Sequence, residues 1–175
     1  MIALLFAVAA IHLVDDTGRT RSVDEWRGTP TIVVPMYTRC PLACPAIAEN
    51  LKRATADMDV NSYRVVFFSF DKRDTAADLR AFRERHRLPL AWTLANAGEA
   101  DTRRLLDSLD YRVSDVMSHP NAVIVVKGDT AKTFNSVDDA LAFARGGSDL
   151  LGRFGGAALA VALLVCTLSA VLLFR

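Results

Sequence analysis

Two continuous apolar runs, each followed by a segment with helical spacing, constrain the fold of this chain most. The first run covers residues 31–37 and the second covers residues 63–70. A strand that is apolar along its whole length is typical of the centre of a sheet whose two faces are both covered. After the first run, apolar residues recur three to four positions apart at Ile47, Leu51 and Ala54, which predicts an amphipathic helix over residues 46–58. This alternation predicts an α/β protein.

The remaining segments extend the same alternation. Residues 11–14 and 19–23 flank an Asp-Gly-type turn and predict an N-terminal hairpin, followed by a loop over residues 23–28. Further helices are expected over residues 74–87, 99–109 and 136–144, a short strand over residues 90–94, and a last hairpin from residues 121–126 to 132–134. The order predicts one sheet with helices on both faces.

Length and charge limit the protein classes. A chain of 175 residues allows one domain of ordinary size plus an appendage. The net charge is +1 and no segment gathers lysine and arginine. A nucleic-acid-binding protein is therefore not expected, because such proteins need a basic surface.

The appendage is expected at the C-terminus. Residues 154–174 contain no charged residue, and Arg153 and Arg175 flank them. About 20 helical residues at about 1.5 Å each span roughly 30 Å, the thickness of the hydrocarbon core of a bilayer. We therefore expect a transmembrane anchor over residues 154–174, a linker over 147–153 and the folded domain over 11–146. Cys166 lies in the anchor, with no basic neighbour to activate it.

The N-terminal end supports two interpretations. Residues 1–10 are apolar, and Ala7-Val8-Ala9 resembles a signal-peptidase site. No basic residues precede the apolar stretch, and that stretch is short for a secretory signal. A secretory signal and a first strand both remain open, and the few charges near the C-terminal span do not set its orientation.

Two cysteines lie where the first apolar run passes into a helix. Cys40 and Cys44 are four positions apart, and the N–H groups at a helix start favour a thiolate. At this spacing the two sulfurs can close a reversible disulfide, which needs Cα atoms about 4.4–6.8 Å apart. They can also bind one soft metal ion such as Cu(I). Two inert buried thiols are the simplest alternative.

Each of the three histidines has a different context. His12 falls in a strand, and His86 ends a helix, where the dipole favours an imidazolium. His119 precedes Pro120 and the strand of the last hairpin. From such a loop, a neutral imidazole can reach the cysteines and either complete a Cu(I) site or carry a proton.

These motifs together resemble those of the SCO/SenC family of copper chaperones. They are residues 37–45 (Tyr-Thr-Arg-Cys-Pro-Leu-Ala-Cys-Pro), residues 69–75 (Ser-Phe-Asp-Lys-Arg-Asp-Thr) and His119. The similarity runs from about residue 13 to residue 143. It implies a thioredoxin-like three-layer fold with an extra N-terminal hairpin. It also implies one copper ion bound by Cys40, Cys44 and His119.

The resemblance implies a partner and a location as well. A family member is expected to be membrane-anchored, with its soluble domain in the periplasm or an equivalent extracytoplasmic space. There it would deliver copper to the binuclear copper centre of cytochrome c oxidase, or reduce thiols at that centre. The acceptor is thus expected to be the copper-accepting subunit of the oxidase or another copper protein.

The chain departs from the family pattern in three places. Leu42 stands where an acidic residue is often found between the cysteines, and Lys72 stands where proline is usual. The expected anchor is C-terminal, whereas most members carry it at the N-terminus. Asp71 and Asp74 match acidic family positions; a loop-closing hydrogen bond and a helix cap are alternatives to contact with a metal or partner. Met117 is a conceivable soft ligand, with packing as the alternative.

Three functions are compatible with this pattern. The first is a metallochaperone. The second is a thiol-disulfide oxidoreductase in which Cys40 reacts with the partner and Cys44 resolves the mixed disulfide. The third is an assembly or sensor protein whose binding surface changes with the state of the cysteine pair. The histidine favours the first function, because dithiol exchange does not require it.

Overall fold

The computed structural model describes residues 10–116 and 119–146 of the chain. Within them, seven strands form one sheet in the order β2-β1-β5-β4-β3-β6-β7. The strands are β1 His12–Asp15, β2 Thr20–Ser22, β3 Thr31–Met36, β4 Arg64–Ser69, β5 Thr93–Asn96, β6 Val123–Lys127 and β7 Thr130–Phe134. The helices are the 3₁₀ helix η1 Val23–Trp26, α1 Ala43–Ala54, α2 Ala76–His86, α3 Glu99–Ser108 and α4 Val137–Ala144.

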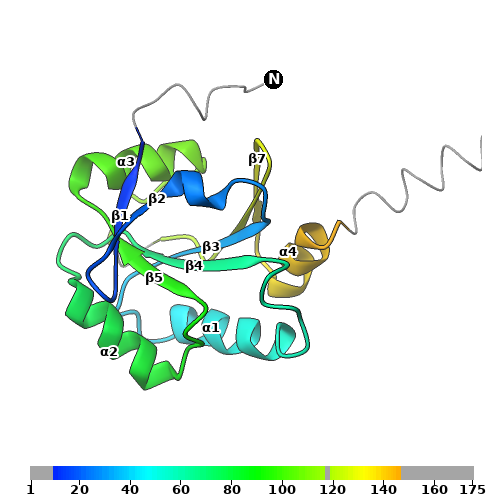
Figure 1. Ribbon diagram of the computed structural model, residues 1–175. Coiled ribbons are helices and arrows are strands. Elements are labelled where there is room, and N and C mark those ends of the chain that lie inside the picture. The colour runs from blue at the N-terminus through cyan, green and yellow to red at the C-terminus, as the bar shows by residue number, and fades with distance from the viewer. Residues whose placement is uncertain (1–9, 117–118, 147–175) are drawn as a thin grey trace, which may run out of the picture. The chain divides into compact units, whose positions relative to one another are not determined.

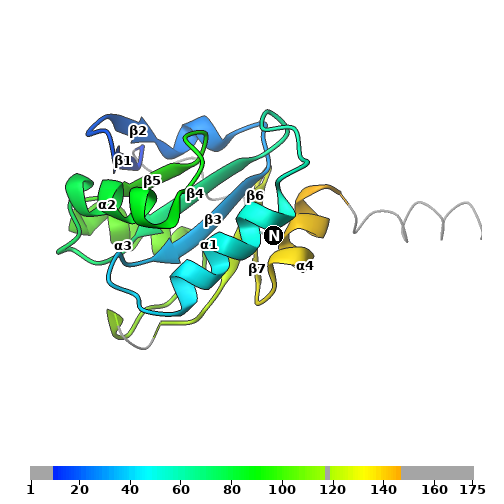
Figure 2. The same cartoon turned by 90° about the horizontal axis from the view of Figure 1, so that it is seen from below.

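The sheet is covered on both faces. Helices α1 and α2 lie on one side and α3 lies on the other (Figure 1), and α4 packs against α1 and β6. In the view from below, α1 runs across the central strands (Figure 2). All six residues of β3 are buried, which explains why its sequence is apolar throughout. The thioredoxin-like three-layer fold with an added N-terminal hairpin is confirmed.

The strand directions bring three loops to one edge of the sheet. Strands β3 and β4 are parallel, and their last residues, Met36 and Ser69, are paired. The loops that follow them, residues 37–42 and 70–75, therefore leave the sheet side by side. Strand β6 is antiparallel to β3, with Ile124 opposite Val33, so the loop that precedes β6 reaches the same edge. This topology brings His119 near the cysteines across about 80 residues of sequence.

Some predicted boundaries differ from the structure. The helix expected over residues 46–58 spans Ala43–Ala54. It can begin before Pro45 because proline fits the first turn, where its missing N–H group is not needed. The strand expected over residues 90–94 begins only at Thr93. The residues before it form a turn, in which the Trp92 N–H donates to the carbonyl of Pro89 at 3.1 Å. Part of the loop expected over residues 23–28 is the helix η1, capped by Ser22.

Several predictions concern residues outside the described ranges. These are the anchor over 154–174, the linker over 147–153, nearly all of the N-terminal segment 1–10, and Met117. In the part of the chain that the structure does describe, no helix has the length and apolarity to cross a membrane.

Candidate metal centre

The two cysteines lie on either side of the start of α1. Cys40 belongs to the turn after β3, where its N–H donates to the carbonyl of Tyr37 at 3.1 Å. Cys44 lies in the first turn of α1, and its N–H donates to the Sγ atom of Cys40 at 3.3 Å. The residue that precedes the helix, Leu42, offers no side-chain cap. The Cys40 sulfur therefore accepts a hydrogen bond that a capping side chain accepts in many helices.

The pKa values of the two thiols are shifted in opposite directions. Burial by itself raises the pKa of Cys40, but hydrogen bonds from the Cys44 thiol and from the N–H groups of residues 42–44 outweigh it, so this pKa is below the ordinary value. Burial raises the pKa of Cys44 far above the ordinary value. Both thiols are free. The N–H groups at the helix start therefore lower the pKa of Cys40 as expected, whereas burial outweighs them and raises the pKa of Cys44.

His119 is held by hydrogen bonds on one side of its ring. The hydroxyl of Tyr111 donates to the carbonyl of Pro120 at 2.5 Å. The Tyr111 oxygen, 3.2 Å from Nδ1 of His119, can then accept a hydrogen bond from an N–H group at that nitrogen. The Pro120 carbonyl lies 3.0 Å from the same nitrogen. Because both neighbours accept, the proton is assigned to Nδ1 and the lone pair to Nε2.

Aromatic rings flank the imidazole. The rings of Tyr37 and Phe70 meet it edge-on, with centroids 5.4 and 5.2 Å away. Tyr111 is also buried and packs against Phe70 at 6.3 Å. These contacts restrict the orientation of the ring, which remains partly exposed to solvent. Such surroundings orient a metal-binding histidine in known metal sites.

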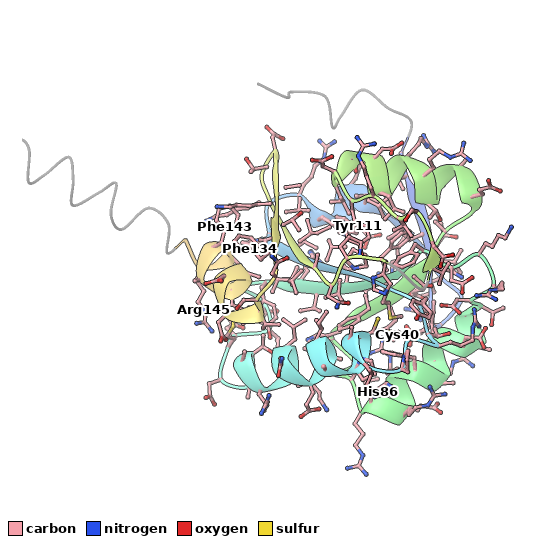
Figure 3. The ribbon with its side chains drawn as sticks, turned by 180° about the vertical axis from the view of Figure 1, so that it is seen from behind. Cys40, His86, Tyr111, Phe134, Phe143 and Arg145 are labelled. Atoms are coloured by element: carbon pink, nitrogen blue, oxygen red, sulfur yellow. The ribbon has the colours of Figure 1, made fainter. Side chains whose placement is uncertain are left out.

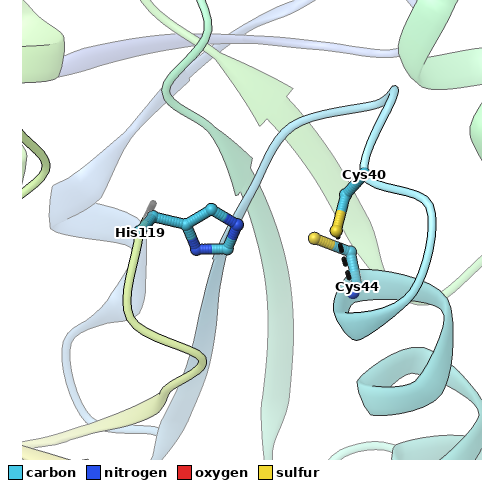
Figure 4. A group of neighbouring side chains, drawn as sticks. All are labelled: Cys40, Cys44 and His119. Atoms are coloured by element: carbon cyan, nitrogen blue, oxygen red, sulfur yellow. Dashed lines mark hydrogen bonds between the residues drawn. The ribbon is translucent and has the colours of Figure 1, made fainter. Parts of the chain in front are cut away.

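The three side chains converge. One ring nitrogen of His119 and the Sγ atoms of Cys40 and Cys44 all lie within 4.8 Å of one another. Figure 4 shows the imidazole directed at the two sulfurs, with His119 arriving from the loop opposite α1. Figure 3 places Cys40 at the start of α1, on the side of the sheet where that helix lies. Two thiolates and one imidazole are soft to intermediate ligands, a set that suits Cu(I) and also suits zinc.

Asp74 fastens the loop that leads to Cys40. Its carboxylate is buried and accepts from the N–H of Thr38 at 2.7 Å, the hydroxyl of Thr38 at 2.6 Å and the hydroxyl of Ser69 at 2.6 Å. The cap of α2 is Thr75. The loop-closing alternative therefore describes Asp74, and the helix-cap alternative does not.

Asp71 joins two arginines beside the site. It accepts from Arg39 at 2.6 Å and from Arg73 at 2.9 Å. Hydrogen bonds from Arg73 and then Arg39 hold the pKa of Asp71 well below its usual range, although burial opposes them. Neither Asp71 nor Asp74 is part of the converging ligand group.

The other two described histidines lie elsewhere. His12 begins β1. His86 ends α2 as expected, with its ring 4.4 Å from that of Phe82. The expected preference for an imidazolium there is wrong, because burial and then the charges of Arg85 and Lys52 lower the pKa of His86. Tyr111 was not predicted from the sequence, since an isolated tyrosine in a loop carries no motif.

Comparison with known proteins gives a consistent result. The family model described as SCO1/SenC matches residues 7–134. No sequence among the curated proteins matches the chain. A putative electron transport protein from Aquifex aeolicus VF5 is 30% identical, with a TM-score of 0.68, over 78% of this chain and 94% of that protein.

Two more distant structures share the fold. Bradyrhizobium japonicum ScoI with copper bound is 21% identical, with a TM-score of 0.63, over 78% of this chain and 96% of its own. BsSco, described as having a disulfide switch and as a member of the Sco family of cytochrome c oxidase assembly proteins, is 20% identical. Its TM-score is 0.67, and the match covers 82% of this chain and 94% of BsSco.

Proposed function

The chain belongs to the SCO1/SenC family, and from this premise we propose that it is a copper chaperone that carries one Cu(I) ion between Cys40, Cys44 and His119. The observation that carries the proposal is the convergence of two sulfurs and one ring nitrogen within 4.8 Å. The presence of an imidazole beside the dithiol is the feature that distinguishes this site from a simple redox pair.

The geometry gives each ligand a distinct part in loading. Nε2 of His119 carries the free lone pair, because Nδ1 faces Tyr111 and Pro120. Cys40 has the lower pKa and supplies the first thiolate, whereas Cys44 has a raised pKa and loses its proton to solvent as the ion binds. Loading therefore releases protons and becomes more favourable as pH rises.

Release to an acceptor proceeds by ligand exchange. Three ligands leave Cu(I) with room for an incoming thiol or imidazole. Cys40 is the more exposed of the two cysteines, so an acceptor ligand replaces it before it replaces Cys44. The oxidation state of copper does not change in this exchange.

The acceptor and the location are part of the proposal. The acceptor is the subunit of cytochrome c oxidase that holds the binuclear copper centre, or another copper protein. Support comes from the description of BsSco as a member of a family of cytochrome c oxidase assembly proteins. The folded domain faces the periplasm or an equivalent extracytoplasmic space, and residues 154–174 anchor it, as their uncharged composition favours.

Thiol-disulfide exchange is a second candidate function of the same pair. The contrast between an acidified Cys40 and a buried Cys44 favours it. The Cys40 thiolate attacks a partner disulfide and displaces one partner thiolate, which takes up a proton. Cys44 then loses its proton and attacks Cys40, which releases the partner as a dithiol and leaves an internal disulfide. The two functions are compatible, because copper loading needs reduced cysteines.

The test is a titration of the reduced protein with Cu(I) against a competing chelator. We expect one copper ion per chain for the wild type and a loss of affinity of about tenfold or more for His119→Ala, since one of three ligands is removed. The matched control is His12→Ala, at the start of β1. If wild type and His119→Ala bind copper equally weakly, the chaperone proposal fails and the oxidoreductase gains.

A further inference from the structure

Tyr37 contacts two of the proposed copper ligands from one position. It directly follows the last residue of β3 and is 3% exposed. Its carbonyl accepts from the N–H of Cys40 at 3.1 Å. Its ring meets the imidazole of His119 edge-on, with an angle of 89° between the ring planes. One buried residue therefore links the loop that carries the sulfurs to the loop that carries the imidazole.

The hydroxyl of Tyr37 is a hydrogen-bond donor to the sulfur of Cys40. Burial, the charges of the neighbouring Cys40 and Cys44 sulfurs, and a hydrogen bond with the Cys40 side chain all raise the pKa of Tyr37. The phenol therefore keeps its proton at neutral pH, and a thiolate beside it can only accept. The N–H of Cys44 lies 3.3 Å from the same sulfur, so two donors stabilise a Cys40 thiolate.

Cys44 has weaker support as a free thiolate. It is 1% exposed, and burial raises its pKa far above the ordinary value. The backbone groups of Tyr37 and Cys44 that hydrogen-bond to its sulfur do not offset this burial. Of the two sulfurs, that of Cys40 is thus the one that the protein stabilises better as an anion without a metal.

A donor beside a metal-bound sulfur affects how readily that sulfur leaves the metal. A free thiolate carries more negative charge than a copper-bound one, so it accepts the stronger hydrogen bond. The Tyr37 hydroxyl therefore stabilises the Cys40 sulfur more after it leaves copper than before. The exposure of Cys40 gives an acceptor access to this ligand, and the hydroxyl adds a chemical reason for it to leave.

We propose that Tyr37 is a positioning residue that makes Cys40 the first ligand to leave copper, through a hydrogen bond from its hydroxyl to the departing sulfur. The inference rests on the proposed function, because it assigns the order in which the ligands of that site are exchanged. The carbonyl and ring contacts of Tyr37 keep the hydroxyl in place between the two loops.

A simple packing role predicts the opposite kinetic effect. If Tyr37 only braced the loop, removal of its hydroxyl would loosen Cys40 and speed the release of copper. Loss of the proposed hydrogen bond leaves the departing thiolate less stable and slows release. Tyr37→Phe separates the two cases, because it keeps the ring and the backbone and removes only the hydroxyl.

The first measurement is the rate of copper release. The full chain, loaded with Cu(I) in micelles of an uncharged detergent, is mixed with an excess of bathocuproine disulfonate, a chelator whose Cu(I) complex is coloured. We expect Tyr37→Phe to release copper about fivefold more slowly than the wild type, because part of a charge-assisted hydrogen bond is lost. The matched control is Tyr63→Phe, the same change at a buried tyrosine just before β4, which should leave the rate unchanged.

The second measurement needs no copper. Dithiothreitol breaks the Cys40–Cys44 disulfide, is itself oxidised to its cyclic disulfide, and leaves a Cys40 thiolate, a Cys44 thiol and one proton. Without the hydroxyl this thiolate is less stable, so we expect the equilibrium constant for reduction to fall about fivefold in Tyr37→Phe. For a two-electron couple this corresponds to a reduction potential lower by about 20 mV. Tyr63→Phe should keep the wild-type potential.

Slower release together with a lower potential, in Tyr37→Phe alone, supports the inference. Faster release, unchanged release or an unchanged potential in Tyr37→Phe overturns it while copper binding stands. Equal shifts in Tyr63→Phe overturn it as well, because the effect then does not come from the site. A wild type that binds no copper overturns the proposed function itself, at the loading step and before any release is measured.

Discussion

Asp74 offers the sharpest test of how the fold positions the site. Its buried carboxylate accepts hydrogen bonds from three donors, the N–H and hydroxyl of Thr38 and the hydroxyl of Ser69. Asp74→Ala leaves all three without their partner. Each buried donor left unsatisfied costs about 1–3 kcal/mol, and water can enter the space left by the carboxylate. We take a value in the lower half of that range for each of the three donors and expect the free energy of unfolding to fall by about 4 kcal/mol.

The contact between Asp74 and Arg39 adds little to this value. The Arg39 side chain is nearly half exposed, and exposed ion pairs contribute about 0–1 kcal/mol. Asp74→Asn should therefore be much milder, at about 1–2 kcal/mol. Its carbonyl can still accept from the Thr38 N–H and the Ser69 hydroxyl, and the Thr38 hydroxyl can turn to accept from the new amide.

The assay is thermal and denaturant unfolding of the reduced protein. A loss of about 4 kcal/mol lowers the melting temperature by roughly 15 °C for a domain of this size. Asp57→Ala, at an exposed carboxylate on a turn, is the control and should change stability by less than about 0.5 kcal/mol. Should Asp74→Ala lose no more than Asp57→Ala, the three hydrogen bonds do not fasten the loop and the reasoning is refuted.

The same loop connects stability to the site. Thr38 lies two residues before Cys40, so a loosened Thr38 widens the range of positions open to the Cys40 sulfur. We expect Asp74→Asn, which keeps most of the stability, to weaken Cu(I) binding by about tenfold, as loss of other supporting contacts does around metal sites. Equal affinity for Asp74→Asn and the wild type would show that the loop holds its shape without this carboxylate.

Three further predictions follow from the hydrogen bonds and the acidities. Tyr111→Phe, which keeps the ring and removes the hydroxyl next to His119, should weaken Cu(I) affinity about tenfold in the chelator competition; an unchanged affinity contradicts the role given to this hydrogen bond. When the reduced protein is alkylated with iodoacetamide, Cys40 should react first and at a pH below the ordinary thiol range, because burial protects Cys44. Faster labelling of Cys44 in peptide mapping refutes the assignment of Cys40 as the more acidic thiol. Although burial opposes the shift, hydrogen bonds from Thr17, Arg19 and Arg21 lower the pKa of Asp15 to about 2. The folded pKa therefore lies below the unfolded value of about 3.9. The stability that Asp15 contributes is then present above pH 4 and is lost as pH falls towards 2. Asp15→Asn should flatten the unfolding free energy against pH in that window, and an unchanged slope counts against the shift.

The order of helices and strands follows from the sequence because burial leaves a direct pattern. Strand β3 is buried on both faces and reads as an unbroken apolar run. Proline positions were less informative, since Pro45 is compatible both with a helix start and with a place just inside one. Strand β5 was predicted too early because Leu90 is apolar, yet it lies exposed outside the sheet.

The residues of the site could be predicted from the sequence, but their supporting contacts and the pKa shifts of the two cysteines could not. The cysteine spacing and His119 carry recognisable motifs, and the antiparallel placement of β6 explains how the histidine reaches the thiols. The support from Tyr111 and the inward turn of Asp71 and Asp74 depend on contacts between distant loops. Such contacts leave no spacing pattern in a single sequence. The opposite acidities of Cys40 and Cys44 were likewise hidden, because they depend on how deeply each thiol is buried.

The most direct test of the central claim is X-ray absorption spectroscopy of the full chain loaded with one equivalent of Cu(I) under reducing conditions. The account predicts a three-coordinate ion with two sulfur neighbours and one imidazole nitrogen, and loss of the nitrogen signal in His119→Ala. A first shell of sulfur alone, identical in the wild type and in His119→Ala, would contradict it.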